Sequence, residues 1–334
     1  MYAEEPAGAV VLAPPGEWAL PKQPTIASTA WRFVRRKPLG AFGLLIVFFM
    51  VLMTVGTPQA AFGMLELPSR PLGFELGKPW LARYDAEQQF KHADSGRLIQ
   101  YEAPSLKHWL GTDQAGRDNW SRIVWGARRS LFVGLWALAI ATAAGAVIGI
   151  LSGFFRGWLD TVVQRLMDAL QSFPPLITLI LIVSLNPFTS QPSLAIVAFA
   201  LGFVGITQVQ RIVRGVVLST REQPYVEAAR VIGASDLRTM VFHILPNIMA
   251  PIIVVFSIGL GAVILAEAAL AFIAPQQVPQ DPSWGLMLNQ GRFVMLDHPW
   301  PALVSGFAIA LAVLGFNLAG DALRDVLDPR LRLG

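Results

Sequence analysis

Long apolar runs alternate with short polar segments along most of the chain. The first run covers residues 39–56, and later runs cover 131–155, 172–186, 193–210, 246–273 and 299–320. Most of these are close to the roughly 20 residues that a helix needs to cross the hydrocarbon core of a bilayer. The pattern therefore predicts an all-α, polytopic membrane protein with six transmembrane helices.

The positions of basic residues predict how these helices are oriented. Four positive charges lie in Trp31–Lys37, directly before the first apolar run. The polar segment between the fourth and fifth runs carries five more: Arg211, Arg214, Arg221, Arg230 and Arg238. Because Lys and Arg concentrate on the cytoplasmic side of membrane proteins, we expect both chain ends and this polar segment inside the cell.

Composition supports the membrane class and limits the possible chemistry. Hydrophobic residues make up 54% of the chain and charged residues 14%, and the mean hydropathy is +0.52. The chain has no cysteine, and its four histidines are scattered singly, so we expect neither a disulfide nor a metal site. No basic run with interleaved aromatic residues indicates nucleic-acid binding.

No catalytic motif is visible in the sequence. Gly111 and Gly116 have the spacing of a phosphate-binding loop, but Arg117 and Asp118 follow where Lys and Ser or Thr would be needed. Neither a zinc-protease helix nor a nucleophile elbow is present. We therefore expect a chain that is not an enzyme.

The polar segment between the fourth and fifth runs predicts two short helices joined by a bend. Pro224 suits a first helical position, and Glu227 lies in the first turn, where the helix dipole favours an anion. Gly233 can end that helix in a left-handed conformation, and Ser235 can cap a second helix. The second helix is expected to stop or kink before Leu245-Pro246, because proline lacks the backbone donor. We call residues 224–246 the elbow.

The residue spacing of the elbow resembles a known motif. Glu227-Ala228-Ala229, followed by Gly233 and Leu245-Pro246, is similar to the EAA loop of permease subunits of ATP-binding cassette (ABC) importers. His243 stands where the general family has an aliphatic residue, and this departure looks like the dipeptide/oligopeptide/nickel branch. Residues 108–118 and 281–285 are also similar to segments of that branch.

The resemblance implies the type I ABC importer permease fold, with an extracytoplasmic insertion between the first two helices. The expected divisions are a cytoplasmic tail 1–38, a first transmembrane helix 39–56, an extracytoplasmic segment 57–129, a permease core 130–321 and a cytoplasmic tail 322–334. The implied location is the inner membrane of a prokaryotic cell.

The resemblance also implies partners. They are a homologous second permease subunit, two ABC ATPase subunits, an extracytoplasmic solute-binding protein and membrane lipid. ATP and Mg²⁺ would bind to the ATPase subunits, and this chain would hold no cofactor. The residues expected to couple it to the ATPase are Pro224, Glu227, Ala228, Ala229, Arg230, Gly233, Ala234, Ser235, Leu245 and Pro246.

Glu267 is a carboxylate inside the fifth apolar run, and such residues are functional candidates by default. It lies 21 residues after Pro246, about 31 Å of helix rise, and is expected near the outer interface. Two roles stay open, a structural hydrogen bond and a place on the solute path.

The function implied by the resemblance is ATP-driven import, with small peptides as the first choice of solute and nickel complexes or opines as alternatives. An ion-coupled secondary transporter is a competing interpretation. It would need charged sites near the bilayer midplane on repeated halves, and neither is evident.

Overall fold

The computed structural model describes residues 34–35, 37–55, 79–185 and 192–327. The chain divides into two units, Met1–Pro38 and Leu39–Gly334. Most of the first unit lies outside the described residues, and so do the last residues of the predicted C-terminal tail and the predicted turn at 186–191. The description below concerns the second unit, with the helix that begins at Pro38.

The described residues form helices, with isolated bridges and no strand among them, which confirms the all-α prediction. A π-helical turn, Met240–Ile244, separates α8 from α9, and a short 3₁₀ turn spans Pro275–Gln277. The α-helices are α2 (Pro38–Thr54), α3 (Asn119–Phe155), α4 (Gly157–Gln171), α5 (Pro175–Leu185), α6 (Leu194–Thr220), α7 (Pro224–Val231), α8 (Asp236–Thr239), α9 (Leu245–Ile273), α10 (Trp284–Arg292) and α11 (Trp300–Leu327).

The six predicted spans correspond to six helical units. In the described part of the chain, four helices are long and apolar enough to cross a membrane: α3, α6, the continuous helix Asp236–Ile273, and α11. The bent pair α4 and α5 can count as a fifth span. The shorter apolar helix α2 corresponds to the first predicted run.

Two helices extend beyond the predicted spans. The second span was expected from residue 131, but α3 begins at Asn119, inside the segment assigned to the outside. The third was expected at 172–186, after a short loop. Instead α4 is a helix from Gly157, and α5 meets it at 88°. Pro174 and Pro175 lie at this break, where proline disfavours a continuous helix.

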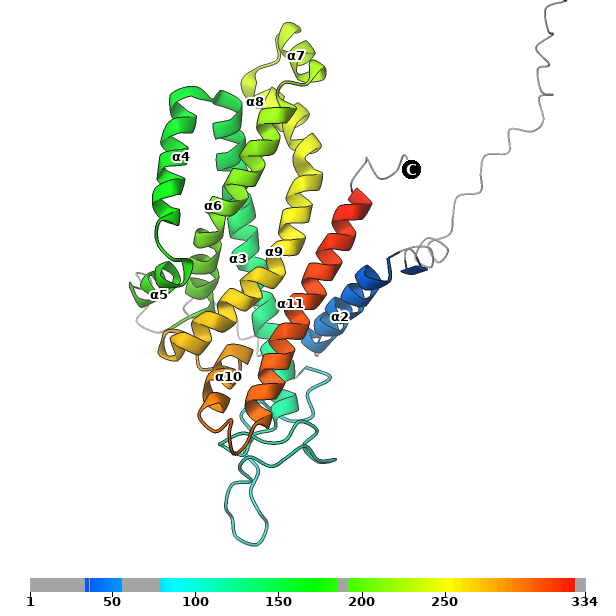
Figure 1. The fold of residues 1–334 in the computed structure, drawn as a ribbon, viewed down its shortest axis with the longest axis vertical. Coiled ribbons are helices and arrows are strands. Elements are labelled where there is room, and N and C mark those ends of the chain that lie inside the picture. Colours follow the sequence, from blue (N-terminus) through cyan, green and yellow to red (C-terminus); the bar gives the residue numbers. More distant parts are fainter. Residues whose placement is uncertain (1–33, 36, 56–78, 186–191, 328–334) are drawn as a thin grey trace, which may run out of the picture. The chain divides into compact units, whose positions relative to one another are not determined.

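Glycines allow the long helices to pack closely. A Cβ added at Gly149 on α3 would lie 2.8 Å from the Gln210 carbonyl of α6, and one added at Gly145 would lie 2.7 Å from Cβ of Val209. Small residues at helix interfaces are typical of membrane proteins, where close packing replaces the hydrophobic effect. The small residues of the second apolar run therefore place α3 against α6 along much of its length (Figure 1).

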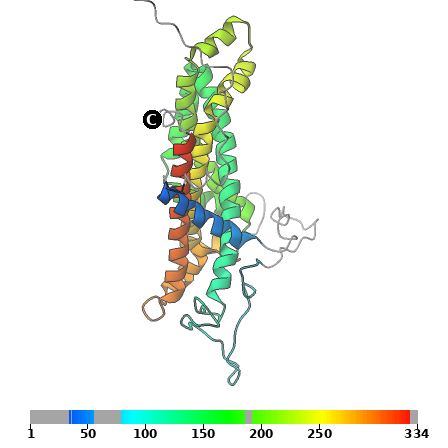
Figure 2. The ribbon, with the colours of Figure 1, turned by 90° about the vertical axis from the view of Figure 1, so that its right-hand side faces the viewer.

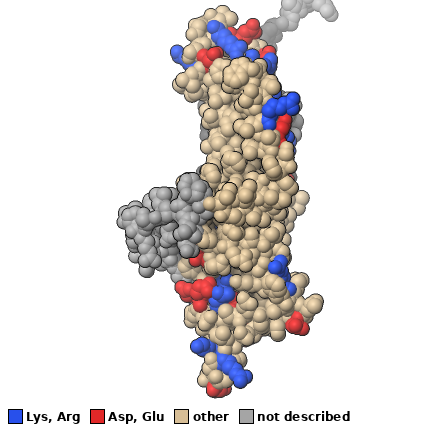
Figure 3. Space-filling model, turned by 90° about the vertical axis from the view of Figure 1, so that its left-hand side faces the viewer, with Lys and Arg blue, Asp and Glu red and all other residues tan. Residues whose placement is uncertain are grey.

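The two ends of this unit contain different elements. The elbow, with α7 and α8, lies at one end, and the described segment 79–118 lies at the other together with α10 (Figures 1 and 2). Figure 3 shows charged side chains toward both ends of one face, with a broad uncharged band between them. Such a band suits contact with hydrocarbon.

Helix α10 packs against α3, α9 and α11 at the end of the unit opposite the elbow (Figure 1). Its Trp284 is 2% exposed and donates from Nε1 to the Ile123 carbonyl of α3 at 3.0 Å. A Cβ at Gly285 would lie 2.3 Å from the Ala268 carbonyl of α9. The segment 275–298 was expected to be a loop, but it contains a buried helix that ties α3 to α9.

Candidate functional site

The first half of the elbow is a capped helix, as the sequence predicted. Pro224 occupies the first turn of α7, and Gly233 has a φ of +85°. Beyond the end of α7, the Gly233 N–H donates to the Arg230 carbonyl and the Ala234 N–H donates to the Ala229 carbonyl, at 2.9 and 3.0 Å. These two bonds form a Schellman motif, which satisfies carbonyls left open at a helix end.

The second half of the elbow runs directly into α9. The Ser235 hydroxyl accepts from the Arg238 N–H at 3.4 Å and caps α8. The chain was expected to stop or kink at Leu245-Pro246, but the helix continues through the π turn Met240–Ile244. The Leu245 N–H donates to the Met240 carbonyl five residues back, so the turn takes in one extra residue. That extra residue accommodates Pro246, which has no N–H of its own.

The predicted coupling residues differ in exposure. Ala229 is 3% exposed and packs within this chain, so of the paired alanines only Ala228 is open to a partner. Leu245 and Ala234 are partly buried. The remaining members of the set are exposed: Pro224, Glu227, Arg230, Gly233, Ser235 and Pro246.

Sequence reasoning missed an exposed apolar surface on the elbow. Val231 and Ile232 at the end of α7 are 81% and 84% exposed, and Leu237 and Phe242 are 68% and 69% exposed. Four large apolar side chains in a polar segment were the available signal, because two short helices cannot bury them. Exposed apolar groups of this kind mark interaction sites.

Ion pairs connect α4 to the end of α6 that leads into the elbow. Arg214 of α6 donates from Nε and Nη2 to the two carboxylate oxygens of Asp160 of α4, both at 2.6 Å. Arg211 and Asp168 form a second pair at 3.0 Å, which is about half exposed. The first pair is bidentate and partly buried, so it is the stronger of the two links.

A cavity of about 600 Å³ lies between α3, α6 and α9. Most of its lining is apolar, including Leu138 of α3, Ile212 of α6 and Val254 of α9. Gln208 and Arg324 contribute polar groups. Because α6 and α9 flank the elbow in the sequence, the cavity walls are direct continuations of it.

Glu267 does not line this cavity. It is 0% exposed, its Oε2 accepts from the Ser130 hydroxyl at 3.2 Å, and its Oε1 lies 3.7 Å from Nε of Arg129. Arg129 also donates from Nη1 to the carbonyls of Pro279 and Asp281, at 2.9 and 2.7 Å. The group joins the start of α3, the end of α9 and the loop before α10.

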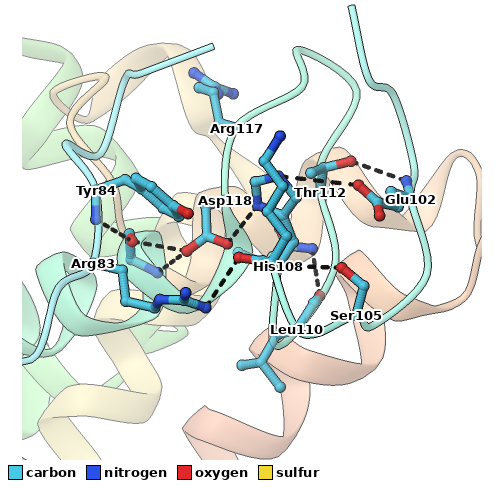
Figure 4. A network of polar contacts seen from close by, with 12 residues as sticks. Arg83, Tyr84, Glu102, Ser105, His108, Leu110, Thr112, Arg117 and Asp118 are labelled. Atoms are coloured by element: carbon cyan, nitrogen blue, oxygen red, sulfur yellow. Dashed lines mark hydrogen bonds and ion pairs between the residues drawn. The ribbon is translucent and has the colours of Figure 1, made fainter. Parts of the chain in front are cut away.

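The start of α3 is held by a polar network that was not predicted (Figure 4). The Asp118 carboxylate accepts from the N–H and the hydroxyl of Ser121, at 2.8 and 2.7 Å, and from His108 Nδ1 at 3.0 Å, in the tautomer that protonates this nitrogen. Asp118 and His108 are 1% and 0% exposed. Asp118, one of the two residues that failed the phosphate-loop pattern, therefore serves as the N-cap of α3.

A second carboxylate in this segment holds two arginines. Asp113 accepts from Arg117 Nε at 2.8 Å and from Arg122 Nη1 at 2.9 Å. Burial acts to lower the pKa of the Arg117 guanidinium, but the Asp113 and Glu87 carboxylates outweigh that effect and raise it. In the described residues no group of His, Cys, Asp and Glu could hold a metal ion.

Comparisons with known proteins identify the family of the chain. Residues 145–333 match the family of binding-protein-dependent transport system inner membrane components. The chain is 38% identical over 325 residues, 96% of its length and 98% of the relative's, to a putative peptide transport system permease protein of Brucella suis biovar 1.

Two further relatives cover about three quarters of the chain. Identity is 39% over 241 residues (72% of this chain, 78% of the relative) to the dipeptide transport system permease protein DppC of Alkalihalophilus pseudofirmus. It is 39% over 253 residues (76% and 81%) to the glutathione transport system permease protein GsiD of Pectobacterium atrosepticum. The chain therefore belongs to the binding-protein-dependent transport system inner membrane components, the permease subunits of ABC importers.

Proposed function

We propose that the chain forms half of the translocation path of an ATP-driven importer of small peptides, and that the elbow receives movement from an ATPase subunit. The observation that carries this proposal is the continuity of the elbow with the cavity walls. Only residues 221–223 separate α6 from α7, and α8 continues through the π turn into α9. A displacement of the elbow would therefore move two walls of the cavity.

The exposed residues of the elbow suit a docking surface for the ATPase. Val231, Ile232, Leu237 and Phe242 would bury apolar area in a groove of the partner. Glu227 and Arg230 would supply polar contacts, and Ala228 would allow close approach. ATP and Mg²⁺ would bind to the ATPase, and this chain would carry out no hydrolysis.

The cavity favours a paired permease. In the described residues its lining comes from α3, α6, α9 and Arg324 of α11, and a homologous second permease would complete the wall. A pair of ATPase subunits would then face a pair of elbows. Rigid-body rocking about a packed interface is an established way to open such a cavity to alternate sides.

The orientation follows from charge and from the docking role. The elbow would lie in the cytoplasm of a prokaryotic cell, together with both termini. The segments 79–118 and 275–298 would face outside, where a solute-binding protein delivers its cargo. Segment 56–78 lies outside the described residues, so its part in docking is a prediction from sequence alone.

Small peptides suit the cavity better than the alternatives. Its apolar walls could accept apolar side chains, and the guanidinium of Arg324 could attract a carboxylate. The names of the relatives, which refer to peptides, a dipeptide and glutathione, support this choice. Nickel complexes and opines remain the alternative solutes.

Glu227→Lys tests the proposal in the assembled transporter. We expect the variant to stay in the membrane, to retain less ATPase on co-purification, and to take up labelled dipeptide at least about tenfold more slowly, as for a disrupted polar contact at an interface. Asp94→Lys, an exposed change in the extracytoplasmic segment, is the matched control for membrane insertion and ATPase retention.

Two results would contradict the proposal. One is unchanged dipeptide uptake and ATPase retention in Glu227→Lys. The other is uptake that stops with a protonophore while ATP is maintained, because that result indicates an ion-coupled carrier.

A further inference from the structure

Three arginines converge where α6 joins the elbow. Arg156 follows the last residue of α3, Arg221 follows the last residue of α6, and Arg230 lies on α7. Arg221 donates from Nη1 to the Phe154 carbonyl, and its Cζ lies 5.9 Å from the centre of the Phe154 ring. Cζ of Arg230 lies 5.1 Å from the same centre. Two guanidinium groups thus lie over one aromatic ring, and the charge of Arg156 acts on Arg221 beside them. We call these arginines the joint cluster.

One carboxylate only partly balances the joint cluster. Glu222 Oε1 lies 2.7 Å from Arg156 Nη2 and 3.4 Å from Arg221 Nε. Asp160 is also within electrostatic reach of Arg156, but both of its oxygens accept from Arg214. The arginines and Glu222 together leave an excess of two positive charges in the described part of this site.

Arg221 experiences that excess directly. Burial lowers the pKa of its guanidinium, the positive charges of Arg156 and Arg230 lower it further, and Glu222 acts in the opposite direction. Its Nε is buried and makes no hydrogen bond. A group held beside two like charges gains from an added anion.

The surroundings of the joint cluster indicate which anion fits. Phe155 ends the apolar surface of α3 and is 49% exposed, and Trp158 at the start of α4 is 77% exposed. Exposed aromatic residues between an apolar surface and charges are typical of the headgroup level of a bilayer. Arg156 is 44% exposed, so an anion at that level can reach the joint cluster.

We propose that the joint cluster binds the phosphate of an anionic glycerophospholipid from the inner leaflet, and that this lipid holds the elbow against the end of α3. Basic pockets between membrane helices on the cytoplasmic side bind anionic headgroups. Acyl chains could lie along Phe155 and Trp158, which a free phosphate could not use. The inner-leaflet assignment rests on the orientation in the proposed function.

Lipid binding can be measured without transport. The assembled importer is placed in phosphatidylcholine nanodiscs, and spin-labelled phosphatidylglycerol is titrated against spin-labelled phosphatidylcholine. The wild type should prefer phosphatidylglycerol. Arg156→Gln should weaken that preference about fivefold, the effect of about one charge near an anionic headgroup, and Arg156→Lys should retain most of it. Arg165→Gln, an exposed arginine on α4, is the matched control.

Glu222→Gln separates a lipid site from a merely structural ion pair. Both Arg156→Gln and Glu222→Gln break the same pair, but Glu222→Gln raises the net positive charge and should strengthen phosphatidylglycerol binding. Changes in the same direction for both variants, or none for Arg156→Gln, would overturn the proposal. Displacement of the lipid by millimolar inorganic phosphate would indicate a free-phosphate site instead.

The same samples distinguish this proposal from the proposed function. Glu227→Lys should retain the wild-type lipid preference, since within the described residues no ion pair joins Glu227 to the joint cluster. A variant that loses uptake but keeps the lipid preference therefore has a defect in ATPase docking and not in lipid binding. Loss of the phosphatidylglycerol preference in Arg156→Gln is instead a defect of the joint cluster.

Discussion

The Asp118 carboxylate caps the start of α3. Its carboxylate satisfies the Ser121 N–H and hydroxyl and holds the buried His108. Asp118→Ala removes all three contacts and leaves buried donors without acceptors. We expect a loss of about 1–3 kcal/mol in stability and a lower Tm for the purified protein.

A graded series tests this role of Asp118. Asp118→Asn keeps one oxygen for the helix cap, so its Tm should fall between those of the wild type and Asp118→Ala. Asp94→Asn removes an exposed carboxylate in the same segment and should leave the Tm unchanged. Equal effects of Asp118→Asn and Asp118→Ala would show that charge, and not the cap, is what matters.

Gly233 is the second position where one residue determines local structure. Its φ of +85° is left-handed, and an added Cβ would meet no atom within 4 Å, so any cost of substitution comes from the backbone. Gly233→Ala should cost about 1–2 kcal/mol locally and weaken coupling. Gly233→Asn should cost less, because Asn tolerates this conformation.

Dipeptide uptake per unit of permease in the membrane measures the effect at Gly233. We expect the order wild type, Asn, Ala, with Gly233→Pro slowest. Uptake that is equal in all four proteins would contradict a role for this bend in coupling.

Local signals of this kind could be predicted from the sequence. Pro224, Gly233 and Ser235 occupy the helix start, bend and cap that their chemistry indicated. The cap at Asp118 was not predicted, because only the start of the second span, at residue 131, was expected, and not the start of its helix. A cap is recognisable only when the helix start is known, and the polar residues at 119–129 concealed it.

At the scale of elements, the link between α4 and α6 depends on a partly buried ion pair. Arg214→Gln removes both Arg214 donors from Asp160 and leaves Gln164 Nε2, at 3.4 Å, beside it. We expect a stability loss of about 1–3 kcal/mol, seen as a Tm lower by about 2–8 °C. Arg211→Gln breaks the more exposed pair with Asp168 and should change the Tm much less.

Charge exchange provides the decisive comparison for α4 and α6. The double variant Asp160→Arg with Arg214→Asp should recover part of the lost Tm, since the pair can form again in the opposite sense. Two independent losses that simply add would show that the residues act separately.

Helices that are interrupted or bent were the hardest to predict. The charge-free stretch 169–210 indicated two spans, and Pro174-Pro175 lie at the break, but the sequence does not give the angle of 88° between α4 and α5. Leu245-Pro246 was expected to stop or kink a helix. Since a π turn can absorb a missing donor by adding one residue, proline alone does not determine whether the chain ends, kinks or continues.

At the scale of the whole molecule, the number and order of spans follow from hydropathy, but contacts between distant residues do not. The sequence does not indicate that Trp284 of α10 packs beside Ile123 of α3, because the two residues lie far apart in the chain. Nor does it indicate that Ala229 is buried while Ile232 is exposed to solvent. These differences arise from tertiary packing, which here buries the small Ala229 side chain and leaves the larger, more hydrophobic Ile232 exposed.

Glu267 provides the test at this scale, because it joins parts of the chain more than 130 residues apart. Glu267→Gln removes the carboxylate beside the buried Arg129 guanidinium. An uncompensated buried charge costs about 3–5 kcal/mol, so we expect a clear fall in Tm. Adding Arg129→Met should restore part of it, because an apolar residue replaces the unpaired charge. If Glu267 contacted solute instead, Glu267→Gln would change which dipeptides compete for uptake and leave the Tm unchanged.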